Sequence, residues 1–72
     1  QMFNANKLRG VMAEKGCSAD KLAGALGINP STLSRKMSGI SEFTRSEIQI
    51  AAAFLKLSAH DIQNIFFAQE LA

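Results

Sequence analysis

The apolar residues of this 72-residue chain recur at spacings of three and four, which is the period of an α-helix. No stretch alternates apolar and polar residues for long enough to predict a strand. Capping residues divide the pattern into five helical segments. The first runs from about Asn4, its N-cap, to Lys15 and stops at Gly16, with an apolar stripe of Leu8, Val11 and Met12. The chain is therefore predicted to be all-α.

The second and third segments are short and are separated by a tight turn. Ser18 is the N-cap of the second segment, which ends at Gly27, a residue that adopts a left-handed conformation without a steric penalty. Asn29 is the N-cap of the third segment, Pro30 fits its first helical position, and Gly39 ends it. Two short helices joined in this way predict a helix-turn-helix. The inward-facing residues of the two segments are Leu22, Ala23, Leu26, Leu33 and Met37.

Two further segments open with capping boxes, in which the N-cap and the residue three positions later bond to each other's backbone N–H groups. The boxes are Thr44 with Glu47 and Ser58 with Asp61. The fourth segment carries apolar residues on two sides, so we expect it to be the central, most buried helix. Its stripes are Ile48, Ala51, Ala52 and Leu55 on one side, and Ile50, Phe54 and Leu57 on the other.

The fifth segment has more apolar residues than one core-facing side can hold. Ile62, Ile65 and Phe66 face the core, which leaves Phe67 and Leu71 in surplus. A domain of this size rarely uses five Phe in its own core, so Phe67 and Leu71 predict a surface for a second copy or another protein. The alternative interpretation is that the chain frays after Phe67.

The composition excludes several classes of protein. Apolar residues make up 47% of the chain and charged residues 19%, which is not the composition of a disordered tail. The longest apolar run has six residues, whereas a membrane-spanning helix needs about 20. No N-terminal stretch has the order of a signal peptide, so a soluble, cytoplasmic protein is expected. The length fits one domain, residues 1–72.

The chain lacks the residue sets on which enzymes and metal sites depend. Cys17 is the only cysteine, so no internal disulfide can form, and one Cys with one His cannot complete a zinc site. There is no nucleophile–base pair, no carboxylate dyad in a plausible cleft and no phosphate-binding glycine loop. We therefore expect no enzyme, no cofactor and no metal site.

The charges are unevenly distributed along the chain. Residues 1–36 hold six cations against two carboxylates, and residues 37–72 hold two cations against four carboxylates. A basic first half indicates a face for a polyanion, although fourteen charges can also scatter by chance.

The third segment has the polar, small-residue surface that a helix needs to enter the major groove of double-stranded DNA. Arg35 is the best candidate for direct reading, because a guanidinium pairs bidentately with guanine O6 and N7. The predicted base-contacting residues are Pro30, Ser31, Ser34 and Arg35. Side chains or helix N-termini that would hold phosphates are predicted at Ser18, Asn29, Thr32 and Lys36. The alternative is that these residues only solvate an exposed helix.

The turn and the third segment share one motif, which reads Ala23-x-x-x-Gly27-Ile28-Asn29-x-Ser31-Thr32-Leu33-Ser34-Arg35. This motif resembles the helix-turn-helix of the phage Cro and repressor family, also called the xenobiotic-response-element family. The segment from Ser34 to Thr44 is similar to one in small phage Cro-like proteins. The likeness in the five-helix plan covers nearly all of the chain.

The resemblance implies a compact five-helix, lambda-repressor-like domain that binds operator DNA as a two-fold dimer and controls transcription. The family's base-reading positions fall on Pro30, Ser31 and Arg35. A phosphate-gripping Gln that is common early in the second helix of the family is replaced here by Ala19, so the chain departs from the family at one backbone contact.

A second hypothesis keeps the helix-turn-helix scaffold but assigns the chain to binding another repressor. The modest net charge of +2, the residue at Ala19 and the acidic, aromatic-rich second half favour such a protein-interaction module. An antitoxin would need a longer partner-binding tail than remains after the fifth segment.

Overall fold

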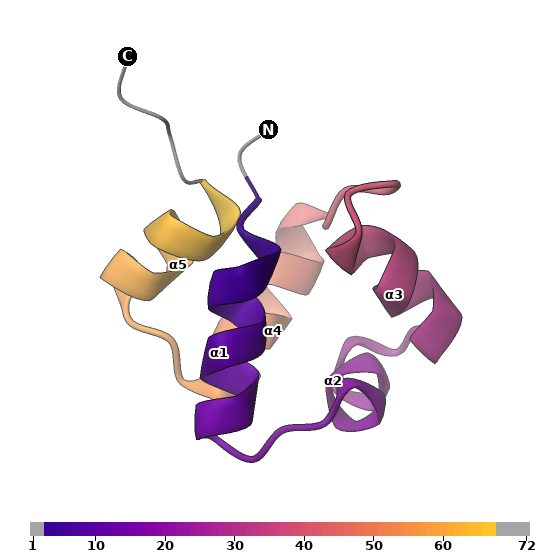
Figure 1. The fold of residues 1–72 in the computed structure, drawn as a ribbon, viewed down its shortest axis with the longest axis horizontal. Helices are drawn as coiled ribbons and strands as arrows, with labels where there is room; N and C mark the ends of the chain where they lie inside the picture. Colours follow the sequence, from indigo (N-terminus) through magenta and orange to yellow (C-terminus); the bar gives the residue numbers. More distant parts are fainter. Residues whose placement is uncertain (1–2, 68–72) are drawn as a thin grey trace.

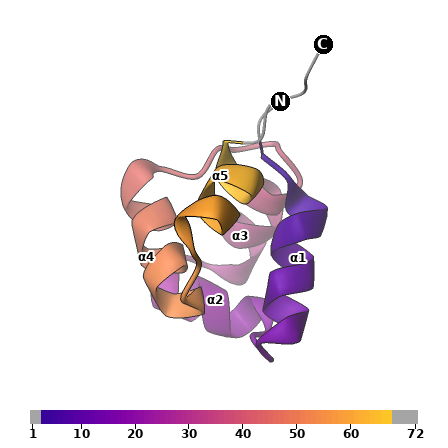
Figure 2. The ribbon, with the colours of Figure 1, turned by 90° about the vertical axis from the view of Figure 1, so that its left-hand side faces the viewer.

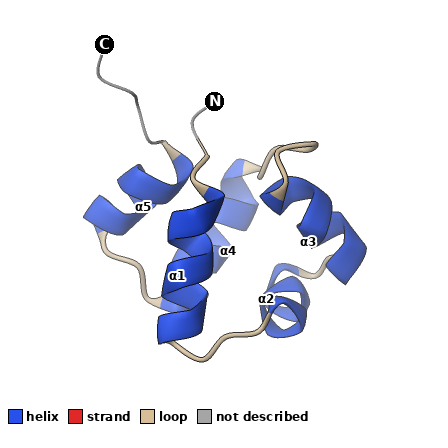
Figure 3. Cartoon of the chain, viewed as in Figure 1, coloured by secondary structure: helices blue, strands red, loops and turns tan. Residues whose placement is uncertain are grey.

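The computed structural model describes residues 3–67, and within them the chain forms five helices connected by turns and short loops, without strands (Figure 3). The helices are α1 (Ala5–Glu14), α2 (Ala19–Leu26), α3 (Pro30–Met37), α4 (Arg45–Leu55) and α5 (Ala59–Phe66) (Figure 1). The all-α fold and the helix-turn-helix of α2 and α3 are confirmed.

Each helix begins at the N-cap that the sequence predicts. At each cap a side-chain oxygen accepts a hydrogen bond from a backbone N–H in the first turn, and the caps are Asn4, Ser18, Asn29, Thr44 and Ser58. Both predicted capping boxes also form, with Glu47 and Asp61 bonding back to the backbone N–H of Thr44 and Ser58. A cap contributes about 1 kcal/mol, which is a large contribution to helices of only 8 to 11 residues.

The tight turn between α2 and α3 depends on a left-handed residue. Gly27 ends α2 with φ +70°, and the backbone N–H of Ile28 then donates to the carbonyl of Ala23. Ile28 packs against the core from the turn, and Asn29 opens α3 directly after it. The two helices are thus held in the arrangement predicted from the sequence.

All five helices contribute to one apolar core. Its buried members are Leu8, Val11, Met12, Leu22, Ala23, Leu26, Leu33, Met37, Ala51, Leu55, Ile65 and Phe66. The inward-facing residues predicted for the first three helices are all among them, which confirms the helical pattern of that part of the chain.

The expectation that α4 is the most buried helix is wrong. Ala51 and Leu55 are buried on the side that α2 and α5 cover, but Ile50 and Phe54 on the other side are 41% and 48% exposed. Within residues 3–67 nothing packs over that second side closely enough to bury it. An apolar stripe at helical spacing shows that a side can be buried, but not that the chain has an element to cover it.

Three of the five phenylalanines form an aromatic cluster that joins the two ends of the described chain. Phe3, Phe43 and Phe66 have ring centroids 5.1–5.8 Å apart. The backbone N–H of Asn4 also donates to the carbonyl of Ile65 at 2.7 Å. These contacts hold the start of α1 against the end of α5 and against the loop that leads into α4.

The ends of α1 and α4 are connected by a lysine. The ammonium of Lys15 donates to the carbonyls of Leu55 and Lys56, which are left without helical partners at the end of α4. Lys56 itself is left-handed, with φ 54°. A cation at this position also interacts favourably with the helix dipole.

α3 and α5 lie at opposite sides of the molecule, with α1 and α4 between them (Figures 1 and 2). The outer side of α3 therefore faces away from α5. None of the helices in the described part of the chain is long and apolar enough to cross a membrane.

Substitution of Gly27 by Ala tests the role of the left-handed turn. We expect Gly27→Ala to lower the free energy of unfolding by about 1 kcal/mol, because an L-residue is strained at this φ. The matched control is Gly24→Ala, in the helical part of α2, which should raise it by roughly 0.5–1 kcal/mol. Apart from its chain neighbours and the backbone of its own helix, a Cβ at either position has no heavy atom within 4 Å, so backbone conformation sets both signs. Urea denaturation measures the two effects, and a shift of both variants in the same direction would contradict this account.

Candidate nucleic-acid interface

The outer side of α3 carries the residues that the sequence predicts to contact bases. Leu33, Lys36 and Met37 are buried on the inner side of the helix. The outer side presents four exposed residues, Pro30, Ser31, Ser34 and Arg35. The structure thus brings all four predicted base-contacting residues onto one solvent-facing surface.

The N-terminal end of α3 is organised by Asn29. The Oδ1 atom of Asn29 accepts from the backbone N–H of Ser31 at 2.9 Å and from its hydroxyl at 2.8 Å. In this conformation the Ser31 hydroxyl donates its hydrogen bond to Asn29, so toward a ligand it can act only as an acceptor. It is therefore suited to accept from the exocyclic amino group of adenine or cytosine.

The residues predicted to hold phosphates lie at several different places. Ser18 and Asn29 are exposed at the N-termini of α2 and α3, where both side chains cap their helices. Thr32 is half-buried in the first turn of α3. The two helix N-termini present backbone N–H groups, which is the arrangement that anion binding uses.

Arg35 is exposed, and no ion pair or side-chain hydrogen bond engages its guanidinium among residues 3–67. Its backbone carbonyl accepts from Ile40 at 3.0 Å and from Ser41 at 3.4 Å, which closes the end of α3. The main chain at Arg35 is therefore fixed, while its side chain remains available to a ligand.

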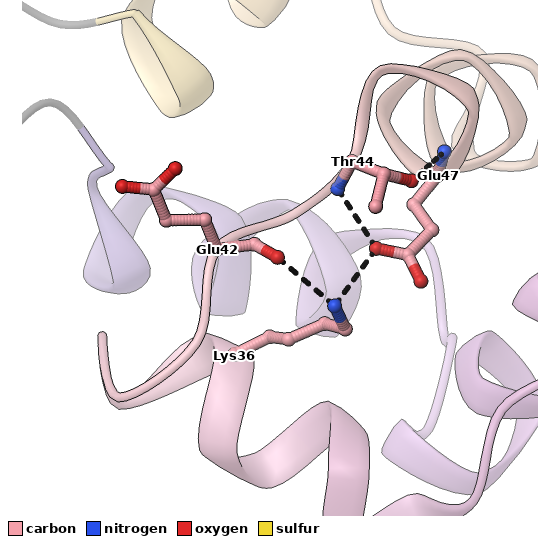
Figure 4. Close-up of polar contacts among 4 residues, drawn as sticks. All are labelled: Lys36, Glu42, Thr44 and Glu47. Atoms are coloured by element: carbon pink, nitrogen blue, oxygen red, sulfur yellow. Dashed lines mark hydrogen bonds and ion pairs between the residues drawn. The ribbon is translucent and has the colours of Figure 1, made fainter.

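Lys36 does not fit the predicted phosphate contact. Its side chain is directed inward, with a relative exposure of 10%, and its Nζ lies 3.0 Å from Glu47 Oε1. The same ammonium donates to the carbonyl of Glu42 at 2.9 Å (Figure 4). Because both bonds are internal, the charge is compensated within the protein. Of the neighbouring cations, Arg35 thus faces solvent and Lys36 faces the interior.

The carboxylate of Glu47 joins two helices. Its Oε1 atom accepts from Lys36 on α3 and also from the backbone N–H of Thr44 at 2.9 Å, while Thr44 Oγ1 accepts from the backbone N–H of Glu47 at 3.1 Å (Figure 4). Sequence reasoning identified the capping box but missed the ion pair. The signal for it was the spacing of Lys36, which lies three residues after Leu33 on the inward side of α3.

The ionisation of Glu47 depends on these bonds. Burial alone would raise the pKa of the Glu47 carboxyl, but the backbone N–H of Thr44 and the ammonium of Lys36 both bond to its ionised form. These bonds outweigh burial, so the pKa of Glu47 lies below the value of an ordinary glutamate, 4.5.

A lowered pKa in the folded protein makes stability depend on pH. The contribution of ionised Glu47 is present above about pH 4.5 and is lost as the pH falls through its lowered folded-state pKa. Glu47→Gln keeps a capping oxygen but removes this titration. We expect the difference in unfolding free energy between wild type and Glu47→Gln to narrow as the pH falls from about 6 to 3. Urea denaturation measures it, with Glu14→Gln on the surface of α1 as control. A difference that stays constant over this range would contradict the assignment.

Among the residues that the structure describes, no group of three or more His, Cys, Asp and Glu could hold a metal ion.

Of the comparisons with known proteins, the one with protein families agrees with this geometry. A comparison with curated proteins found no match. Residues 7–65, which include α2, α3 and the turn between them, match the Cro/C1-type HTH DNA-binding domain. The chain belongs to the Cro/C1-type family of helix-turn-helix DNA-binding domains.

Proposed function

We propose that this protein is a phage Cro-like repressor that reads a pseudo-palindromic operator with α3 in the major groove. The observation that carries the proposal is the outer side of α3, where Arg35 is exposed with its guanidinium unengaged on a DNA-binding fold. The helix is short and its outer residues other than Arg35 are small, so its backbone can approach the base edges closely.

The base contacts follow from the chemistry of the outer side of α3. Arg35 is assigned to guanine, whose O6 and N7 accept both arms of a guanidinium. Ser31 and Ser34 are assigned to base edges, and the ring of Pro30 to a thymine methyl group. Arg35 is therefore the residue on which discrimination between sequences depends most.

The phosphate contacts are assigned to the N-terminal ends of the two helices. Ser18 and Asn29 cap these ends, and Thr32 lies in the first turn of α3. Backbone N–H groups at such ends bind phosphate oxygens without reading sequence. Lys36 is not among these contacts, because its ammonium is used internally.

A pseudo-palindromic operator requires a two-fold dimer, with recognition helices about 34 Å apart. Phe67, which is 47% exposed after α5, is the part of the predicted dimer surface that the structure describes. Leu71 lies outside the described residues. α3 and α5 lie at opposite sides of the molecule (Figure 2), but Phe67 lines a surface pocket with Lys36 and Gly39 at the end of α3.

The second candidate function is that of a module that binds another repressor. It is favoured by the exposed apolar side of α4, formed by Ile50 and Phe54, which this chain leaves uncovered within residues 3–67. Mixing the protein with DNA and with other repressors, and measuring the mass of the complexes, separates the two functions.

As a DNA-binding regulator, the protein would act in the cytoplasm, at the nucleoid of a bacterial host.

The first test is selection of bound sequences from a random pool of double-stranded DNA, followed by gel shifts over a range of salt concentrations. We expect a two-fold symmetric site and an affinity that falls steeply with salt, because bound phosphates release counterions. A scrambled site of the same length is the control. Absence of DNA binding at low salt by folded protein would falsify the proposal.

The second test removes the guanidinium of Arg35. Arg35→Ala should weaken operator binding roughly 5- to 150-fold, the range that corresponds to loss of one bidentate base contact, and weaken binding to scrambled DNA far less. Arg9→Ala, which removes the same charge from the exposed surface of α1, is the matched control. Equal losses for the two variants on both DNAs would show that Arg35 contributes charge and no sequence reading.

A further inference from the structure

We propose that Lys36 is a positioning residue for DNA recognition, which holds the end of α3 against the start of α4 through Glu47 and the carbonyl of Glu42. The inference rests on the proposed function, because it concerns how α3 is presented to DNA. Lys36 lies on the reading helix but on this account never touches the DNA.

The geometry of the cluster carries the inference. The ammonium of Lys36 has a carboxylate oxygen at 3.0 Å and a carbonyl oxygen at 2.9 Å, from two segments that follow α3 in the chain. The side chains of Lys36 and Glu47 are only 10% and 14% exposed. Figure 4 shows the Glu42 carboxylate turned away, so that only its backbone carbonyl faces Lys36. The cluster is a fixed internal connection and not a surface ion pair.

The packing of α3 explains why such a connection is needed. The backbone of α3 lies mainly against α2, and its direct contact with α4 is slight. Leu33 and Met37 hold α3 on the core from one side. Lys36 adds a polar connection from the same inner side to the start of α4.

The connection acts on the reading residue through the backbone. Arg35 is the direct neighbour of Lys36, and its carbonyl is bonded to the loop that also contains Glu42. Movement of the Lys36 end of α3 would therefore move the Cα of Arg35 relative to the groove. A bidentate contact tolerates little misplacement, so loss of the connection weakens reading more than it weakens general attraction to DNA.

Because Lys36 and Glu47 neutralise each other, DNA-binding measurements can distinguish a positioning role from a phosphate contact. A lysine that holds phosphate contributes about one unit to the salt slope of binding, whereas a lysine neutralised by an internal carboxylate does not. Removal of a carboxylate from a DNA-binding protein strengthens its attraction to DNA if only net charge matters. If Glu47 positions α3, its removal instead weakens operator binding.

The experiment compares Lys36→Met and Glu47→Gln with wild type on the selected operator and on scrambled DNA. Lys7→Met, which removes the same charge from the exposed surface of α1, is the matched control. We expect each cluster variant to lose roughly tenfold or more in operator affinity, with the salt slope of binding unchanged. Binding to scrambled DNA should stay unchanged, or become stronger in the case of Glu47→Gln. Lys36→Arg, which keeps the charge and the hydrogen-bond donors, should retain more operator binding than Lys36→Met.

Stability is measured on the same variants. Circular dichroism and thermal denaturation identify any variant that is unfolded at the binding temperature. Glu47→Gln keeps the capping oxygen of α4, so it serves as the second variant if Lys36→Met does not fold. A double variant, Lys36→Met with Glu47→Gln, should lose no more operator affinity than the weaker-binding single variant, because both substitutions act on the same connection.

The results that overturn the inference differ from those that overturn the proposed function. If wild type binds no DNA, the proposed function fails. If wild type binds its operator but Lys36→Met lowers the salt slope by about one and weakens all DNAs alike, Lys36 is a phosphate contact. If folded Lys36→Met and Glu47→Gln both bind the operator as well as wild type or better, the connection does not position α3.

Discussion

Short helices are marginal in water, and this constraint governs the whole fold. Each helix has only 8 to 11 residues, fewer than an isolated helix needs to be stable. The chain meets this constraint because every helix begins at an N-cap side chain and buries one side in a shared core. The caps also determine where each helix starts, and therefore which side chains face inward. The outer side of α3, which we propose reads DNA, has its exposed residues because Asn29 determines where that helix starts.

The register of α3 separates two adjacent cations. One step along a helix turns the side-chain direction by about 100°, so Arg35 faces solvent and Lys36 faces the interior. A buried lysine is costly unless its charge is compensated, and Glu47 provides that compensation from the first turn of α4. The same carboxylate closes the capping box with Thr44. One oxygen atom thus serves both the start of α4 and the placement of α3.

Local signals in the sequence predicted most of the fold. Caps, glycine stops and apolar spacing are properties of a few neighbouring residues, so the five helices and the inward sides of α1, α2 and α3 could be read directly. The exposed side of α3 was predicted for the same reason. The second stripe of α4 was misjudged because burial depends on which other helix covers it, and Ile50 and Phe54 have no local signal of that kind.

The interactions that sequence reasoning missed connect residues through the tertiary structure. Lys15 reaches the end of α4 across about forty positions of the chain, and no local pattern indicates such a partner. Lys36 was assigned to phosphate because lysines on a reading helix commonly have that role. Its helical position beside Leu33 pointed inward, but its choice of partner depended on the path of the loop that brings Glu42 and Glu47 to it.

Three of the five phenylalanines pack in or against the core, and the other two are exposed on the surface. Phe3, Phe43 and Phe66 pack together and hold the loop before α4 against α5. That loop also contains the Glu42 carbonyl that accepts from Lys36, so the aromatic cluster helps to hold this acceptor in place. Phe54 and Phe67 are left exposed on α4 and after α5. Phe67 also lines a surface pocket together with Phe43 and Lys36, so this exposed ring lies beside the connection that holds the end of α3.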